Sequence, residues 1–186
     1  LFMHEWKSLF DSKSGERGIF NRKSAKDKAA ENGRRNVDFD FGTNPCSEII
    51  LRPYQFCNLT EVVVRGADTP SSLKAKVRLA TILGTFQSTL TDFKYLRKIW
   101  KDNTEEERLL GVSLTGIMDN HYTNLPTADF LKKLRQTAVD INKELAKKLK
   151  IPQSTAITCV KPSGTVSQLV DSASGIHTRH SPYYIR

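Results

Sequence analysis

The chain has few cysteines, and their spacing excludes several classes of small protein. Only Cys46, Cys57 and Cys159 are present among 186 residues, and no two of them form a CxxC pair. An odd count without paired spacing argues against a disulfide-stapled secreted scaffold. The 11-residue step from Cys46 to Cys57 does not match a zinc knuckle. We therefore expect a reducing, cytoplasmic setting and no bound metal.

Long apolar runs and an initial methionine are also missing. No stretch approaches the roughly 18 apolar residues of a membrane span, so we expect no membrane segment. The opening residues LFMHEWKSLF lack the features of a signal peptide. With 7 prolines, 10 glycines and 38% hydrophobic residues, the composition is that of a folded chain. A length of 186 residues predicts one domain or a large piece of one, and a first residue that is leucine instead of methionine favours a fragment.

Charge is the next feature, since 29 basic residues against 20 acidic ones give a net charge of +9. Such an excess is typical of a nucleic-acid-binding module, of a protein with a phosphate-bearing ligand, or of a solvated basic face. The basic segment 128–150 contains Phe130 as its only aromatic residue. A surface that binds single-stranded nucleic acid is typically basic with interleaved aromatic side chains on which the bases stack. This segment lacks them, so we expect no nucleic-acid partner.

Hydrophobic periodicity predicts alternating helices and strands. Apolar spacing and capping residues predict helices over 1–12, over 23–36 ending near Gly33, from Pro70 to about Leu90, from Thr104 through an apolar segment 109–118, and from Thr127 to Leu149. Short apolar runs predict strands over 49–51, 59–64 and 155–160. This alternation indicates an α/β fold with a mostly parallel sheet.

The segment NPCSE, residues 44–48, is the first candidate for chemistry. On an extended chain Asn44, Cys46 and Glu48 share one face, which places an amide, a thiol and a carboxylate within reach of one small substrate. The structural alternative is a packing cysteine beside an ion-paired glutamate. Cys57 lies close to Cys46 if the chain reverses at Arg52-Pro53, which suggests redox work or, equally, two packed cysteines.

A second candidate is KPSGT, residues 161–165, which follows the predicted strand and precedes a short helical stretch. Backbone N–H groups and hydroxyls in such a turn favour an anion, although a plain strand-to-helix turn has the same pattern. It is not a Walker motif. His177 and His180 resemble half a metal site, without a third ligand close by.

Taken in order, NPCSE, CNLTEVVV, KPSGT and SGIHTRHSPYYIR resemble the catalytic subunit of ribonucleotide reductase. The resemblance is closest to the adenosylcobalamin-dependent class II enzymes, of the monomeric type. Pro45 favours class II because class I chains usually have leucine there. The large subunit of a class I ribonucleoside-diphosphate reductase is the alternative within the family.

This resemblance implies a fold: a ten-stranded α/β barrel of two parallel halves, with a central finger loop that carries the radical cysteine. Residues 1–186 would form the central part of this single catalytic barrel domain, with N-terminal strands and the C-terminal tail outside the chain. NPCSE would be the tip of the finger loop. The isolated chain would then be inactive.

The resemblance also implies residue roles. Cys46 would become the thiyl radical that abstracts the 3′ hydrogen of the ribose, Glu48 would accept the 3′-hydroxyl proton, and Asn44 would bind substrate hydroxyls. Cys57 would be one of two cysteines that end as a disulfide, its partner lying outside the chain. The substrate phosphates would bind Ser163, Gly164, Thr165 and Val166. No role is implied for Ser14–Gly18, and Cys159 is expected to pack within its strand.

Partners follow from the same resemblance. It implies a ribonucleoside triphosphate or diphosphate as substrate, adenosylcobalamin as cofactor, and thioredoxin or a similar protein as reductant. A deoxynucleotide effector would bind to parts outside the chain, and the protein would be a monomer.

Overall fold

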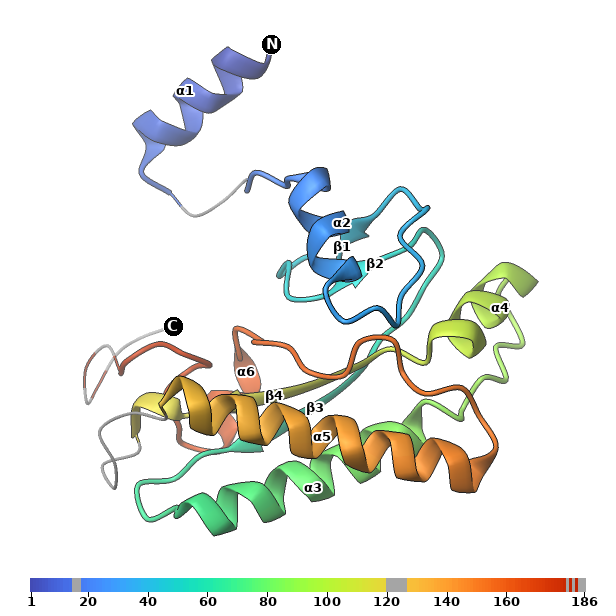
Figure 1. Cartoon of the computed structure of the whole chain (residues 1–186). Helices are drawn as coiled ribbons and strands as arrows, with labels where there is room; N and C mark the ends of the chain where they lie inside the picture. Colours follow the sequence, from blue (N-terminus) through green and yellow to red (C-terminus); the bar gives the residue numbers. More distant parts are fainter. Residues whose placement is uncertain (15–17, 120–126, 180, 182, 184–186) are drawn as a thin grey trace.

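The computed structural model describes residues 1–14, 18–119, 127–179, 181 and 183 (Figure 1). Its elements, in chain order, are α1 (Phe2–Ser12), α2 (Arg22–Ala30), β1 (Gly42–Thr43), β2 (Ile50–Leu51), β3 (Asn58–Val63), α3 (Pro70–Gln87), α4 (Lys98–Glu107), β4 (Leu110–Thr115), the 3₁₀ turn η1 (Ile117–Asp119), α5 (Ala128–Leu149) and α6 (Thr165–Leu169). The fold is therefore α/β, as the sequence predicts.

The central layer is a parallel sheet. β3 pairs with β4 in a register that places Asn58 opposite Leu110 and Val63 opposite Thr115. The segment 155–160 runs along the other edge of β4 and forms one parallel bridge, between Val112 and Thr158. The predicted strand over 155–160 is therefore confirmed in part. The segment lies beside β4, but it forms one bridge instead of a full strand ladder.

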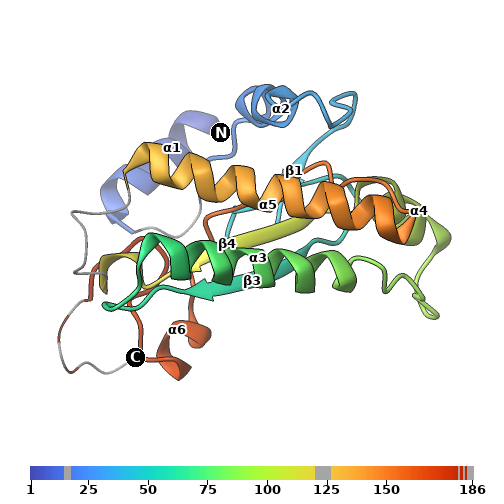
Figure 2. The ribbon, with the colours of Figure 1, turned by 60° about the horizontal axis from the view of Figure 1, so that its bottom comes forward.

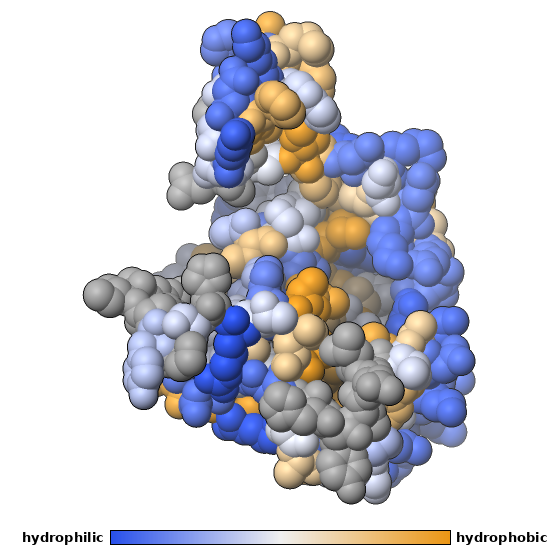
Figure 3. All heavy atoms as spheres, turned by 90° about the vertical axis from the view of Figure 1, so that its left-hand side faces the viewer, coloured by the Kyte–Doolittle hydropathy of each residue, from blue (hydrophilic) through white to orange (hydrophobic). Residues whose placement is uncertain are grey.

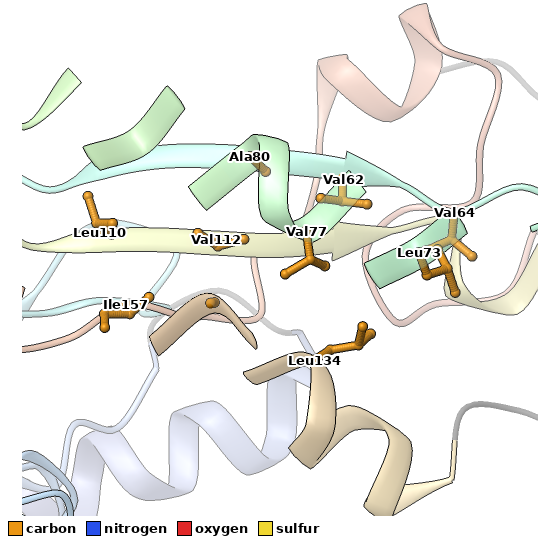
Figure 4. Packing of buried hydrophobic residues seen from close by; sticks show 10 residues of the cluster. Val62, Val64, Leu73, Val77, Ala80, Leu110, Val112, Leu134 and Ile157 are labelled. Atoms are coloured by element: carbon orange, nitrogen blue, oxygen red, sulfur yellow. The ribbon is translucent and has the colours of Figure 1, made fainter. Parts of the chain in front are cut away.

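Helices α3 and α5 cover one face of this sheet, side by side in both ribbon views (Figures 1 and 2). Their apolar residues pack on the strands to form the core, which Figure 4 shows. Its buried members are Val62, Val64, Leu73, Val77, Ala80, Leu110, Val112, Leu134, Ala138 and Ile157. Side chains cap both helices: Thr127 accepts a hydrogen bond from the Phe130 amide, as expected, and Thr69, which was not expected as a cap, accepts one from the Ser72 amide.

The predicted helix over 109–118 is wrong. Leu110–Thr115 is strand β4, and α4 ends at Glu107, with Thr104 inside it rather than at its N-terminus. β4 lies between β3 and the segment 155–160, and residues on both of its faces are buried, including the polar Ser113 and Thr115. Such a strand has no alternation to distinguish it from a buried helix.

A second layer lies on the opposite face of the sheet (Figure 1). It consists of α2 and the antiparallel hairpin β1–β2, in which Gly42 faces Leu51 and Thr43 faces Ile50. α2 begins after Asn21, whose side chain accepts from the Ser24 amide, and buries Ala25 and Ala29. The predicted helix over 23–36 and the predicted strand over 49–51 are therefore confirmed in part, each being shorter than expected.

Buried charged residues hold the base of this hairpin. The Arg35 guanidinium donates to both oxygens of Glu107 at 2.8 Å and to the backbone oxygen of Ile50, also at 2.8 Å. Arg52 lies 3.1 Å from Glu107 and 2.8 Å from Glu106. Since Arg35, Arg52 and Glu107 are almost completely buried, this cluster fixes where the hairpin meets the C-terminal end of α4.

Some expectations concern residues outside those described. Residues 15–17 of the segment Ser14–Gly18, and His180 of the histidine pair, are in this group. In the part of the chain that is described, no three His, Cys, Asp or Glu side chains gather as a metal site. No helix there is both long and apolar enough to cross a bilayer.

Candidate active site

The hairpin reaches the sheet at Gly111. A Cβ atom at this position would lie 2.4 Å from Leu59 Cδ2 and 3.1 Å from both Ile49 Cδ1 and Cys159 Sγ. Only glycine leaves room here for the hairpin, β3 and the segment 155–160 to meet. The hairpin residues that follow Cys46 are thereby brought over the sheet face opposite α3 and α5.

Cys46 lies at the tip of this hairpin. The Ser47 amide donates to the Asn44 backbone oxygen at 2.9 Å, and the Ile49 amide donates to Asn44 Oδ1 at 3.0 Å. Ser47 adopts φ of 62°, so the chain turns sharply instead of continuing as a strand. Prediction of a shared face for Asn44, Cys46 and Glu48 on an extended chain is therefore wrong, because period-two alternation does not apply to a turn.

Burial differs sharply across the tip. Cys46 is exposed, whereas the Glu48 side chain is completely buried. Exposure of the Cys46 thiol makes it accessible to a large reagent or partner. Because the Glu48 side chain is buried, its neighbours decide whether the carboxylate is ionised.

Glu48 is paired with Lys161, which comes 113 residues later in the chain. Lys161 Nζ donates to Glu48 Oε1 at 2.7 Å. Among the described residues, Oε2 of Glu48 has no hydrogen-bond partner although it is buried. Burial alone would raise the pKa of Glu48, but hydrogen bonds from Lys161 and Asn44 and the charge of Lys161 lower it overall. The carboxylate is thus ionised, and its Oε2 can accept a proton, or a hydrogen bond from a hydroxyl group.

Two further thiols lie near this carboxylate. Burial raises the pKa of Cys57, and the negative charge of Glu48 raises it further. The same two causes, with a contribution from Cys57, raise the pKa of Cys159 to about 12. Both groups are therefore neutral thiols at physiological pH, a state that suits hydrogen-atom chemistry better than nucleophilic attack.

Lys161 leads directly into the predicted anion-binding turn. Ser163 is buried and its Oγ has no hydrogen-bond partner among the described residues. Gly164 precedes α6, which begins at Thr165, and Val166 is exposed. A cavity of about 720 Å³ adjoins the turn and is lined by Ser163, Gly164 and Arg179 among others. Arg179 is held by Asp119 and Asp171 at 2.9 and 2.7 Å.

The structure thus brings Glu48, Cys57 and Lys161 together and places the turn 163–165 directly after Lys161. The Cys46 thiol, in contrast, is exposed on the surface of the described part of the molecule. Two neighbours were missed: Lys161, the partner of Glu48, and Cys159, which lies near Cys57 and Glu48 instead of only packing. A lysine directly after a predicted strand was the available signal for the first. Nothing in the spacing of Cys159 indicated the second.

Curated proteins similar to this chain are named as ribonucleotide reductases. An adenosylcobalamin-dependent ribonucleoside-triphosphate reductase of Lacticaseibacillus paracasei is 29% identical over 211 residues, which cover 96% of this chain and 28% of that protein. A reductase of the same name from Lactobacillus gasseri is 30% identical over 208 residues, covering 93% and 27%. A probable one from Dictyostelium discoideum is 29% identical, covering 78% and 19%.

A solved structure agrees with these relatives. The crystal structure of a B12-dependent class II ribonucleotide reductase matches with a TM-score of 0.59 and 25% sequence identity, over 78% of this chain and 23% of that one. No protein-family model matches. The resemblance found in the sequence is thereby confirmed, and the chain spans about a quarter of the length of the curated relatives that it matches.

Proposed function

We propose that this chain is the central part of the catalytic domain of an adenosylcobalamin-dependent ribonucleotide reductase. The whole protein would reduce ribonucleoside triphosphates to 2′-deoxyribonucleotides for DNA synthesis. The observation that carries the proposal is the buried, ionised carboxylate of Glu48, whose Oε2 has no partner among the described residues. It lies beside thiols, on a chain similar to named reductases along most of its length.

The same proposal extends to the fold. The β1–β2 hairpin corresponds to the finger loop, and the parallel strands β3 and β4 belong to a ten-stranded barrel whose other strands lie outside the chain. The position of the hairpin on the sheet face opposite α3 and α5, where Ile49 reaches Gly111, supports this correspondence (Figure 1). Residues 1–186 would then be one portion of a single catalytic domain.

Each residue of the site has a part in the reaction. Cys46, as a thiyl radical, takes the 3′ hydrogen atom of the ribose. Glu48 Oε2 accepts the proton of the 3′-hydroxyl, and Asn44 binds substrate hydroxyls. The 2′-hydroxyl leaves as water, while Cys57 and a cysteine outside the chain supply two electrons and two protons and become a disulfide. The 3′ hydrogen atom then returns from Cys46, and Glu48 returns its proton to the 3′ oxygen.

Radical initiation exceeds what protein side chains can do, so a cofactor must start the reaction. When bound, adenosylcobalamin supplies a carbon-centred radical that can take the hydrogen atom of a thiol. The hairpin tip fits such a bulky group, because Pro45, Cys46 and Ser47 are all exposed. Pro45 and Ser47 would flank the cofactor, and Cys46 would be the hydrogen-atom donor.

Substrate phosphates would bind Ser163, Gly164, Thr165 and Val166, where the unpartnered Ser163 hydroxyl adds a donor. Thioredoxin or a similar protein would restore the thiols, and a deoxynucleotide effector would act through parts outside the chain. We further propose a monomer that works in the cytoplasm.

Cofactor dependence tests the proposal. The full-length protein is incubated with ribonucleoside triphosphates and a dithiol, with and without adenosylcobalamin, and 2′-deoxy products are measured. We expect products only with the cofactor. Reduction that needs an iron or manganese subunit instead would establish the class I alternative, and no reduction under either condition would refute the function.

A further inference from the structure

Lys161 connects two parts of the candidate site that are remote in sequence. Its backbone amide donates to Ser113 Oγ on β4 at 2.9 Å, which fixes the residue beside the sheet. Its side chain then crosses to the hairpin and bonds Glu48 at 2.7 Å. Lys161 is 28% exposed in its side chain, whereas Glu48 is 0% exposed. Lys161 is therefore the more exposed member of the pair, and Glu48 the buried one.

A buried carboxylate needs a compensating charge to stay ionised, since loss of hydration favours its neutral form. The groups that lower the pKa of Glu48 are Lys161, the Asn44 side chain and the Glu48 backbone amide, while the thiols of Cys57 and Cys159 lie near enough for Glu48 to raise their pKa values. Both thiols are neutral. The other charged residues that line a cavity with Glu48 are Lys28, Glu31, Arg34, Arg35 and Arg135. Arg35 is bonded to Glu107, and none of the five contributes to the lowered pKa of Glu48. Lys161 is the cation that bonds Glu48.

We propose that Lys161 is a positioning residue that keeps Glu48 ionised and directs Oε2 toward the substrate. By occupying Oε1, the ammonium leaves Oε2 as the acceptor, so the 3′-hydroxyl proton moves to that atom while Lys161 retains its own protons. This inference rests on the proposed role of Glu48 as proton acceptor. It adds the residue on which that role depends.

The variants follow from this geometry. Lys161→Met removes the charge at similar length, Lys161→Gln keeps a hydrogen-bond donor without the charge, and Lys161→Arg keeps the charge. A matched control is Lys148→Met, because Lys148 bonds Glu144 at 2.6 Å in an equally short but exposed pair. Each is made in the full-length protein, and thermal unfolding confirms that it folds.

The first readout does not depend on turnover. Infrared difference spectra between the protein and its Glu48→Gln variant, recorded against pH, follow the ionisation of Glu48. We expect Glu48 to be a carboxylate well below pH 7 in the unaltered protein. Lys161→Met and Lys161→Gln should move its titration upward by about 1 to 3 pH units, the usual effect of an adjacent opposite charge. Lys161→Arg should restore it, and Lys148→Met should leave it unchanged.

The second readout is the pH profile of kcat/KM. Activity needs ionised Glu48, so its acid limb should move upward in Lys161→Met and Lys161→Gln by the same amount as the infrared titration. An unchanged acid limb with uniformly lower kcat would mean a purely structural lysine and would overturn the inference. So would a protonated Glu48 at pH 7 in the unaltered protein. Absence of any ribonucleotide reduction would instead refute the proposed function, while the infrared titration still decides the pairing.

Discussion

Thiol chemistry at this site depends on where each sulfur lies. Cys46 is exposed at the hairpin tip, while Cys57 and Cys159 lie beneath the hairpin with raised pKa values. A thiyl radical forms from a neutral thiol by loss of a hydrogen atom, so a raised pKa keeps Cys57 in the form that can donate one. Exposure of Cys46 leaves it open to a radical initiator.

Alkylation rates should separate these thiols. A thiol whose pKa is about 12, as for Cys159, is ionised to about 1 part in 10⁴ at pH 8, against about a quarter for an ordinary thiol. With iodoacetamide at pH 8 we expect Cys159, which is half-buried and almost entirely protonated, to react much more slowly than the exposed Cys46, measured by peptide mass spectrometry. Since the raised pKa favours the protonated form, the rate at Cys159 should rise steadily up to pH 12. Equal rates for the two residues would contradict this assignment, and unfolding in denaturant should equalise them.

Gly111 allows the hairpin to rest on the sheet. Gly111→Ala places a Cβ within 2.4 Å of Leu59 and 3.1 Å of Ile49 and Cys159, and we expect a loss of about 1–3 kcal/mol in the free energy of unfolding. Gly42→Ala is the control, because nothing lies within 4 Å of its Cβ. It should change stability by less than about 0.5 kcal/mol. Urea titration measures both, and equal effects would mean that the hairpin is not seated at Gly111.

Among the elements, the base of the hairpin depends on a buried ionic cluster with α4. Glu107 is 1% exposed and bonds both Arg35 and Arg52, whereas its neighbour Glu106 is 60% exposed and bonds Arg52 alone. Removing one member of a buried cluster leaves an uncompensated charge, while an exposed pair contributes little. The two adjacent glutamates should therefore differ strongly in importance.

Substitution of these glutamates tests the cluster. Glu107→Gln should lower the free energy of unfolding by about 3 kcal/mol or more, measured by denaturant titration. Glu106→Gln should lower it by about 1 kcal/mol or less. A reversed order would show that the hairpin is anchored elsewhere.

How far sequence predicts these elements depends on whether a local pattern exists. α3 and α5 were predicted because Pro70, Thr127 and a one-sided apolar stripe mark them. β4 was missed because a strand buried on both faces has no alternation. The shared face of Asn44, Cys46 and Glu48 was expected for an extended chain, and the positive φ of Ser47 that breaks it has no signature in a serine. Lys161 and Glu48 meet only through the tertiary fold, so local patterns could not pair them.

At the scale of the whole molecule, the chain leaves large apolar side chains uncovered. Phe2 and Phe10 on α1 are 65% and 78% exposed, and Leu79 and Leu83 on α3 are 61% and 65% exposed. Figure 3 shows apolar residues of α1 on the surface at the top of the view. Exposed apolar patches mark contact surfaces. The chain spans about a quarter of the length of its curated relatives, so surfaces of this kind are expected.

α1 itself contributes no buried residue. Deleting residues 1–13 should therefore change the free energy of unfolding of this chain by less than about 0.5 kcal/mol, measured by urea titration. As a control, Leu134→Ala in the core should cost about 2–5 kcal/mol. A large loss on deletion would mean that α1 packs against the rest.

The most direct test of the account is electron paramagnetic resonance of the full-length protein with adenosylcobalamin and a ribonucleotide. We expect a thiyl-radical signal coupled to cobalt(II) in the unaltered protein and in Cys57→Ser, which should form the radical but not sustain turnover. The signal should be absent in Cys46→Ser. Persistence of the same signal in Cys46→Ser would show that the sulfur at the hairpin tip is not the radical site.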